Sequence, residues 1–193
     1  MRRIFVPLVL VILAISASGC LSLREAYVPD YILKNGWREN AEKEERGTGL
    51  FGFEKWSIKV YEKSDVAWLT ITTLKTLFLH EKKKLLDMVV KGIERECKDK
   101  EIQLEEVGGG SRELMNGHKS KFVLFNGTDG ENRYKIIGEV WACAQSGTSI
   151  MCIGMAKVSE IEGLVAWKEL VRDPNGSIEG LEGEGLIYCV KCH

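Results

Sequence analysis

The sequence predicts an α+β fold in which two helices pack on one face of a mostly antiparallel sheet. Several short segments alternate apolar and polar residues, or are rich in β-branched and aromatic residues, as strands are. Two other segments carry apolar residues at every third or fourth position, as amphipathic helices do. The order along the chain is two strands, a helix, four strands and a second helix, which is typical of the α+β class.

The strands are identified by the pattern of their side chains. Trp56, Ile58 and Val60 alternate with polar residues, which places the three side chains on one face of a strand. The next segment is rich in Thr, Ile and Leu, which also favour strands. The expected strands lie within residues 53–61, 66–76, 102–107, 122–125, 134–144 and 149–158. Three consecutive glycines, at 108–110, predict a flexible loop after the strand at residues 102–107.

The helices follow from the spacing of apolar residues. The first is expected over about residues 80–98, with a stripe formed by Lys82, Leu86, Val89, Ile93 and Cys97. The second is expected to end near Arg172, with a stripe formed by Ile161, Leu164, Trp167 and Val171. Ser159 and Glu162 have the spacing of a capping box at its start, and a Pro-Asn-Gly turn follows its end.

The first twenty residues have the pattern of an export signal. Arg2 and Arg3 precede an apolar run at residues 4–15, and small residues follow up to Cys20. As a helix the apolar run would be about 18 Å long, which is shorter than the ~30 Å hydrocarbon core of a bilayer. We therefore expect a signal peptide over residues 1–19. An uncleaved helical anchor and ordinary cleavage with secretion are the alternatives.

The end of this segment carries a resemblance to a known class. Ala17-Ser18-Gly19-Cys20 resembles the lipobox of prokaryotic lipoproteins, with Ala17 where that class usually has Leu. The resemblance implies that Cys20 becomes the first mature residue and carries diacylglyceryl and palmitate chains. The protein would then lie on the cell membrane, facing the extracytoplasmic side, where disulfides can persist.

The rest of the chain divides into two parts by its pattern. Residues 20–50 are charged and lack periodicity, which predicts a lipid-anchored tether. Residues 51–193 contain all the expected strands and helices and are long enough to bury a core. We expect them to form a single α+β domain.

A second resemblance concerns this domain. Asn116-Gly117 predicts a turn into a strand that contains Phe122, and a hairpin and a Trp-bearing helix follow. This order resembles the PsbP/Mog1-like lipoprotein fold over about residues 55–170. The resemblance implies a role in binding or assembly and leaves the ligand open.

Two cysteines lie in the expected hairpin near residue 147. A two-residue turn at Gly147-Thr148 would place Cys143 opposite Cys152 in a non-hydrogen-bonded pair and Trp141 opposite Gly154. The Cα atoms of such a pair are about 4.5 Å apart, which a disulfide tolerates. We therefore expect a disulfide here; a redox pair or two buried thiols are the alternatives.

The C-terminal residues allow three interpretations. Cys189, Cys192 and His193 match the Cys-x-x-Cys-His pattern by which haem c is attached. Alternatively, one zinc ion could be held by four thiolates, from Cys143, Cys152, Cys189 and Cys192. The third interpretation is a disulfide that links Cys97 to either cysteine of the tail.

Composition and motifs favour a non-enzymatic function. The chain has 27 basic and 28 acidic residues, a net charge of −1, so it lacks the basic excess of nucleic-acid binders. It contains neither Gly-x-Ser-x-Gly nor His-Glu-x-x-His. Asn126 and Asn175 are candidate glycosylation sites. We expect a membrane-anchored binding or envelope-assembly protein without a cofactor, whose protein or small-molecule partner the sequence does not identify; a small haem electron carrier is the alternative.

Overall fold

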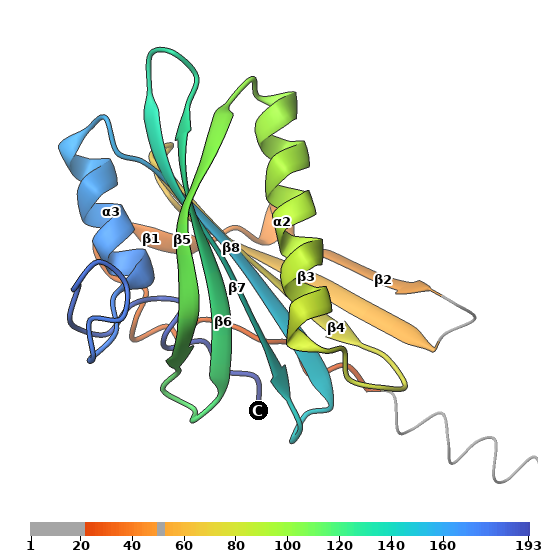
Figure 1. Ribbon diagram of the computed structural model, residues 1–193. Coiled ribbons are helices and arrows are strands. Elements are labelled where there is room, and N and C mark those ends of the chain that lie inside the picture. Colours follow the sequence, from red (N-terminus) through yellow and green to blue (C-terminus); the bar gives the residue numbers. More distant parts are fainter. Residues whose placement is uncertain (1–21, 50–52) are drawn as a thin grey trace, which may run out of the picture.

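The computed structural model describes residues 22–49 and 53–193. They form an eight-stranded antiparallel sheet with two helices, so the predicted α+β class is confirmed (Figure 1). The expected signal peptide, the lipobox and Cys20 lie outside the described residues. Within the described part of the chain, no helix is long and apolar enough to cross a membrane.

The sheet is built mainly from hairpins between consecutive strands. Its order is β1-β3-β4-β8-β7-β6-β5, and β2 also pairs with β3. The strands are β1 (Trp37–Glu39), β2 (Glu45–Gly49), β3 (Glu54–Lys63), β4 (Ala67–Lys75), β5 (Gln103–Glu113), β6 (Lys119–Thr128), β7 (Arg133–Cys143) and β8 (Thr148–Lys157). The two α-helices are α2 (Lys82–Asp99) and α3 (Ile161–Val171), and η2 (Ala41–Lys43) is one turn of 3-10 helix.

The described part of the expected tether, residues 22–49, is folded into the domain, which corrects that expectation. Residues 22–49 supply β1 and β2, and Ala26, Val28 and Trp37 in this segment are buried. The backbone N–H of Val28 donates a 3.0 Å hydrogen bond to the hydroxyl of Tyr61 in β3. The segment is therefore part of the domain, although its few buried apolar residues are too irregularly spaced to form a strand pattern.

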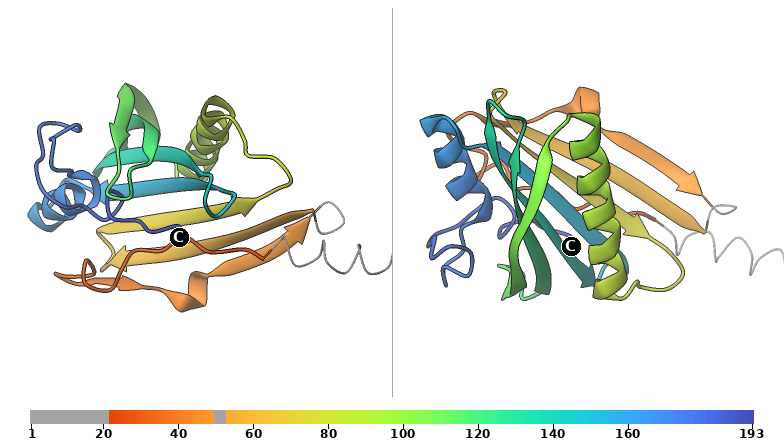
Figure 2. Two further views of the ribbon diagram at one scale, coloured as in Figure 1. Left: turned by 90° about the horizontal axis from the view of Figure 1, so that it is seen from below. Right: turned by 45° about the horizontal axis from the view of Figure 1, so that its top comes forward.

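The two helices lie on opposite faces of the sheet, which corrects the expectation that both share one face. A Cβ atom at Gly138 would meet Val89 of α2, and one at Gly154 would meet Leu170 of α3. Gly138 pairs with Ile153, the residue before Gly154, and neighbouring residues of a strand point to opposite faces. Figure 2 (left) shows α2 on one side of β7 and β8 and the C-terminal segment on the other.

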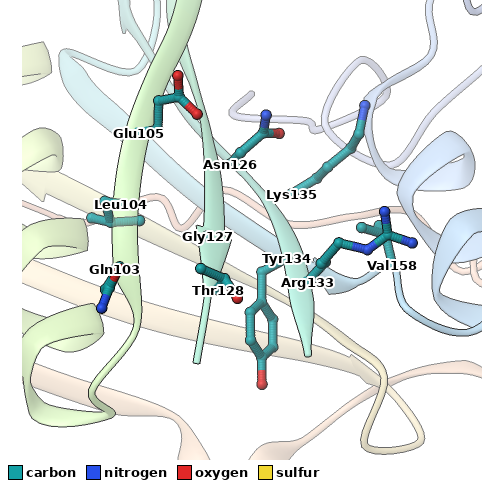
Figure 3. A pocket seen from close by; sticks show the side chains of 10 residues that line it. All are labelled: Gln103, Leu104, Glu105, Asn126, Gly127, Thr128, Arg133, Tyr134, Lys135 and Val158. Carbon is teal, nitrogen blue, oxygen red and sulfur yellow. The ribbon is translucent and has the colours of Figure 1, made fainter. Parts of the chain in front are cut away.

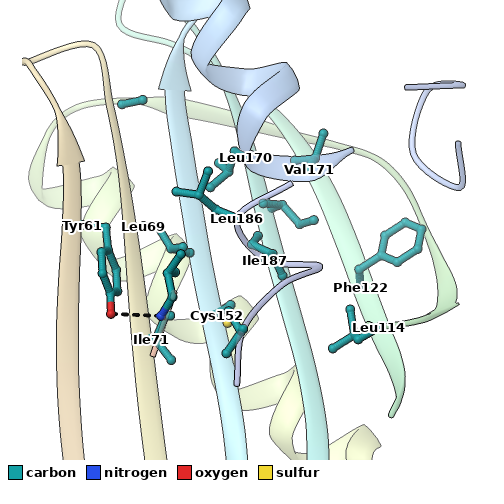
Figure 4. Close-up of a cluster of buried hydrophobic side chains, with 14 of the residues drawn as sticks. Tyr61, Leu69, Ile71, Leu114, Phe122, Cys152, Leu170, Val171, Leu186 and Ile187 are labelled. Carbon is teal, nitrogen blue, oxygen red and sulfur yellow. Dashed lines mark hydrogen bonds between the residues drawn. The ribbon is translucent and has the colours of Figure 1, made fainter. Parts of the chain in front are cut away.

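Each face has its own hydrophobic core. The core beneath α2 contains Leu85, Val89, Ile93 and Cys97. The last three belong to the predicted helix stripe, whereas Leu85 is fully buried in place of the expected Leu86, which is only partly buried. The larger core lies on the other face and joins strands β3, β4, β7 and β8 to α3 and to the C-terminal segment (Figure 4). Leu186 and Ile187 are fully buried there, so the segment after α3 is an integral part of the fold.

The β7–β8 hairpin has a different register from the predicted one. Cys143 pairs with Thr148, Glu139 with Cys152 and Trp141 with Ile150, because a four-residue loop, 144–147, replaces the expected two-residue turn. Gly147 closes the loop with φ +65°. Cys143 and Cys152 therefore share a face but are four residues apart along the hairpin, about 13 Å at strand spacing. The predicted disulfide between them is wrong.

Three local expectations are also corrected. Gly109 and Gly110 lie within β5, where Phe122 packs so closely on them that any Cβ atom would clash. The Asn126-Gly127 sequence favours a turn, but Asn126 lies within strand β6. Ser159 does not cap α3, because its hydroxyl accepts a hydrogen bond from the backbone of Arg133.

Buried ion pairs connect the C-terminal half of the fold. Arg112 of β5 donates two hydrogen bonds to Glu139 of β7, at 2.6 and 2.9 Å, and one of 3.0 Å to Asp173 after α3. The three side chains are fully buried. On α3 itself, Glu169 accepts a hydrogen bond from Lys63 at 2.9 Å. Charged contacts thus fix α3 and the tail relative to the sheet.

Candidate metal centre

Four metal-binding side chains meet near the end of β7. They come from three distant parts of the chain: His118 from the β5–β6 loop, Cys143 from β7, and Cys192 with His193 from the tail. One ligand atom from each residue lies within 4.8 Å of the others. Cys143 and Cys192 are buried, His118 is half-buried and His193 is exposed. The cluster is thus at the edge of the larger core, within reach of solvent.

A tight loop presents His118. The backbone N–H of Leu114 donates to the carbonyl of His118 at 2.9 Å, which closes the loop after β5. Gly117 has φ +76° in this loop, a conformation that glycine adopts without strain. The Asn116-Gly117 turn predicted from the sequence therefore determines where the imidazole lies.

The tail is held from two sides. Tyr27 and Lys191 exchange two backbone hydrogen bonds of 2.9 Å, which ties the tail to the N-terminal segment. The side-chain amide of Asn116 donates to the carbonyl of Val190 at 3.0 Å. Because both contacts precede Cys192 directly, the last two residues are directed toward β7.

The distances fit a tetrahedral zinc ion. The Sγ atom of Cys192 lies 3.2 Å from Nε2 of His118 and 3.6 Å from Nδ1 of His193. The Sγ atom of Cys143 lies 3.4 Å from the same Nδ1. With zinc bonds of about 2.3 Å to sulfur and 2.05 Å to nitrogen, a tetrahedron has sulfur–nitrogen edges of about 3.6 Å. These three sulfur–nitrogen distances are therefore close to those around a bound zinc ion.

Hydrogen-bond donors surround the two sulfur atoms. The backbone N–H of Ser146 donates to Cys143 at 3.5 Å, and the amide of Asn116 donates to Cys192 at 3.7 Å. The indole N–H of Trp141 is fully buried and has no hydrogen-bond partner among the described residues. Burial raises the pKa of the Cys192 thiol, and the indole of Trp141 opposes part of this rise. Donors of this kind are what a metal-bound thiolate needs in its surroundings.

The protonation of the ligands depends on their burial. Burial, with the nearby Cys143, raises the pKa of the Cys192 thiol to about 12. Burial, with His193 and then Lys82, lowers the pKa of His118, which keeps its ring neutral and able to bind a metal. Two buried thiolates need a neighbouring positive charge, and a divalent metal ion supplies one.

The sequence predicts three of the four residues of this cluster as candidate ligands. Cys143, Cys192 and His193 belonged to the candidate ligand sets, whereas His118 did not. The tight Asn116-Gly117 turn directly before His118 is visible in the sequence. The contact between this turn and the tail, which brings His118 to Cys192, is not. Cys152 and Cys189 are buried elsewhere and do not join the cluster.

The cysteines in the described part of the chain are all free thiols: Cys97, Cys143, Cys152, Cys189 and Cys192. The expected links from Cys97 to Cys189 or Cys192 are therefore not formed. Cys97 lies in the core beneath α2, on the face of the sheet opposite to the tail. Cys189 lies in a turn at the end of the fold, with its N–H bonded to the carbonyl of Gly185.

A separate surface hollow has a different location. It has a volume of about 480 Å³ and lies on β5, β6 and β7, at the end away from the loop that holds His118 (Figure 3). Lys135 in its wall pairs with Glu179, and Tyr134 donates to Asp129 at 2.8 Å. Two side chains of its wall are thus paired with residues outside the hollow. Asn126 is exposed in this wall, and Asn175 is exposed in the turn after α3.

Comparison with models of known protein families finds no match to this chain, and no curated protein matches its sequence.

Proposed function

We propose that this chain is a membrane-anchored, extracytoplasmic and non-enzymatic binding protein whose domain holds one zinc ion through His118, Cys143, Cys192 and His193. The observation that carries the zinc proposal is the convergence of the four ligand atoms within 4.8 Å. The export signal and the lipobox-like sequence that ends at Cys20 support the membrane anchor. The lipid on Cys20 would hold the protein on the outer side of the cell membrane.

The ligand set favours zinc and a structural role. Two thiolates and two imidazoles are the typical donors of structural zinc sites, which are four-coordinate and tetrahedral. Catalytic zinc sites use three protein ligands and keep the fourth position for water. Four protein ligands leave no such position here, so the ion would join the tail, the β5–β6 loop and β7.

The haem alternative has weaker support from the geometry. Haem c attachment uses both thiols of the Cys-x-x-Cys-His pattern together with its histidine. Cys189 is fully buried in a turn and outside the cluster, whereas Cys192 and His193 belong to it. The two thiols of the pattern therefore have different surroundings, which suits a zinc site that uses only one of them.

Metal analysis of the full chain, purified in detergent without added metal or chelator, tests the proposal. We expect about one zinc per chain in the wild type and none in the Cys143→Ser/Cys192→Ser double variant. Cobalt substitution should give thiolate-to-metal absorption in the wild type and not in the double variant. Cys97→Ala is the matched control, because it removes a buried free cysteine outside the cluster.

The outcomes separate the site from the fold. The exposed His193 can be changed to Ala without disturbing the core, so His193→Ala should weaken zinc binding while the circular dichroism spectrum stays unchanged. Zinc that persists in the double variant, or a wild-type chain that takes up neither zinc nor cobalt, would overturn the metal proposal. Bound copper would retain the site and overturn the choice of zinc. The membrane anchor is tested separately by Cys20→Ser, which should release the protein from membranes.

A further inference from the structure

An apolar tip projects from one end of the sheet. In the loop between β4 and α2, Leu77, Phe78 and Leu79 are exposed, with Phe78 82% exposed. Phe53, the residue before β3, is half-exposed. It lies beside this loop, since Phe53 and the loop line one hollow of about 260 Å³. Consecutive exposed apolar residues are unfavourable on a surface that contacts only water. The tip comprises these four residues.

Lysines lie next to the tip. Lys82, Lys83 and Lys84 form the first turn of α2, which contains no acidic residue. Positive charge at the N-terminal end of a helix opposes the helix dipole, so these lysines do not serve helix stability. Residues 75–84 contain four lysines and one acidic residue, Glu81. An apolar tip beside a basic cluster complements the surface of an anionic bilayer.

The N-terminal segment approaches the same end of the molecule. The backbone N–H of Ala26 donates to the hydroxyl of Thr73 at 2.8 Å, and β4 runs from there to the tip. Glu25 pairs with Arg46 of β2, which also runs toward this end. Figures 1 and 2 show the start of the described chain at the end of the sheet that carries the loop between β4 and α2. Residue 22, where the described chain begins, thus lies at the end of the sheet that carries the tip.

We propose that the tip is a second membrane contact, in which Phe53 and residues 77–79 enter the interfacial layer of an anionic bilayer and Lys82, Lys83 and Lys84 bind its headgroups. The contact goes beyond the proposed function, because it needs neither the zinc ion nor the lipid on Cys20. A lipid on one residue would leave the domain free to turn. A second contact fixes its orientation, with the tip against the membrane.

Bromolipid quenching tests this contact in the full chain. The chain is reconstituted into phosphatidylcholine vesicles with or without phosphatidylglycerol, with bromine near the headgroup end of the acyl chains. Phe78→Trp adds a fluorophore at the tip, and Ile161→Trp adds one at a site that is equally exposed, 82%, at the start of α3. We expect quenching of the added fluorescence at position 78 to be at least about twice that at position 161 in anionic vesicles.

The lysines supply a second arm. Lys82→Glu/Lys83→Glu/Lys84→Glu in the Phe78→Trp chain should reduce the quenching in anionic vesicles, as should high salt, since headgroup attraction is electrostatic. Equal quenching at positions 78 and 161 would overturn the tip contact. Flotation of the vesicles without phosphatidylglycerol reports the anchor separately, because they lack the anionic headgroups that the lysines would bind. A chain that floats without tip quenching keeps the anchor and loses this inference, and a chain that does not float loses both.

Discussion

The Sγ atom of Cys143 lies 3.4 Å from Nδ1 of His193, although fifty residues separate them in the sequence. This contact brings the end of the tail to the end of β7. The tail crosses the larger core before it reaches this point, with Val190 fully buried and Lys191 bonded to Tyr27. A metal ion bound here would therefore stabilise an ordered tail and the core beneath it.

Removal of zinc is expected to lower the thermal stability of the protein. Zinc at about 100 times its dissociation constant would stabilise the fold by about 2.7 kcal/mol, which for a chain of this size corresponds to a shift of about 5–10 °C. Calorimetry of the detergent-solubilised chain with and without a chelator measures the shift. Cys143→Ser/Cys192→Ser should show no response to the chelator. A response equal to that of the wild type would contradict a site at these residues.

Thiol labelling should distinguish the cysteines of the metal centre from those of the cores. Burial, with Glu96 next, raises the pKa of Cys97 to about 11, and burial, with Glu139 next, raises that of Cys152 well above its ordinary value. Both should stay unreactive toward iodoacetamide at pH 8, where the thiolate is the reacting form. A chelator should accelerate modification of Cys143 and Cys192 alone, because loss of the ion would release the end of the tail and with it the burial that raises the pKa of Cys192. Peptide mass mapping over time provides the measurement, and chelator-dependent modification of Cys97 would indicate that the whole fold has opened.

The sequence predicts the elements of this fold better than their pairing. The α2 stripe of Val89, Ile93 and Cys97 is buried as expected, because a helical period depends only on nearby residues. The predicted β7–β8 register is wrong because Gly147 suits the first position of a two-residue turn as well as the last position of a four-residue loop. That choice alone decides whether Cys143 faces Cys152 or Thr148.

The metal centre depends on longer-range information. Cys192 and His193 attract attention as a sequence pattern, but their partners are set by where the tail crosses the sheet. That path depends on the burial of Leu186 and on the Tyr27–Lys191 pairing, both between segments far apart in the chain. Sequence spacing alone could therefore suggest a metal site and could not identify His118 as a member of the cluster.

The buried Arg112–Glu139 pair is expected to be essential for stability. Glu139→Ala would leave the fully buried guanidinium of Arg112 with only part of its acceptors, and loss of one partner of a buried pair typically costs about 3–5 kcal/mol. Urea denaturation gives the free energy of unfolding. The exposed Arg38 provides the control, since Arg38→Ala should change stability by less than about 0.5 kcal/mol. A loss for Glu139→Ala no larger than that of the control would contradict a buried ion pair.

Asp129 gives a stability difference that depends on pH. Hydrogen bonds from the side chain and backbone of Asn132, with a further one from Tyr134, hold the pKa of Asp129 well below its ordinary value of 3.8. A lowered folded-state pKa stabilises the protein above the unfolded-state pKa, and this contribution is lost progressively as pH falls from about 4 through the lowered pKa. Asp129→Asn should therefore be less stable than the wild type at pH 7, with a difference that shrinks toward pH 3. Chemical denaturation at both pH values measures it, and a difference that grows on acidification would refute the assignment.

The opposite placement of the helices can be tested through two glycines. A Cβ atom at Gly138 would lie 2.4 Å from Val89, and one at Gly154 would lie 2.5 Å from Leu170, so each Gly→Ala variant should lose about 1–3 kcal/mol by overpacking. Val89→Ala should relieve part of the loss in Gly138→Ala and none in Gly154→Ala, and Leu170→Ala should do the reverse. Double-mutant cycles from urea denaturation give the coupling energies. Gly49→Ala is the control, because its nearest neighbour would be 3.8 Å away. If Val89→Ala relieved both glycine variants equally, the two helices would have to share one face of the sheet.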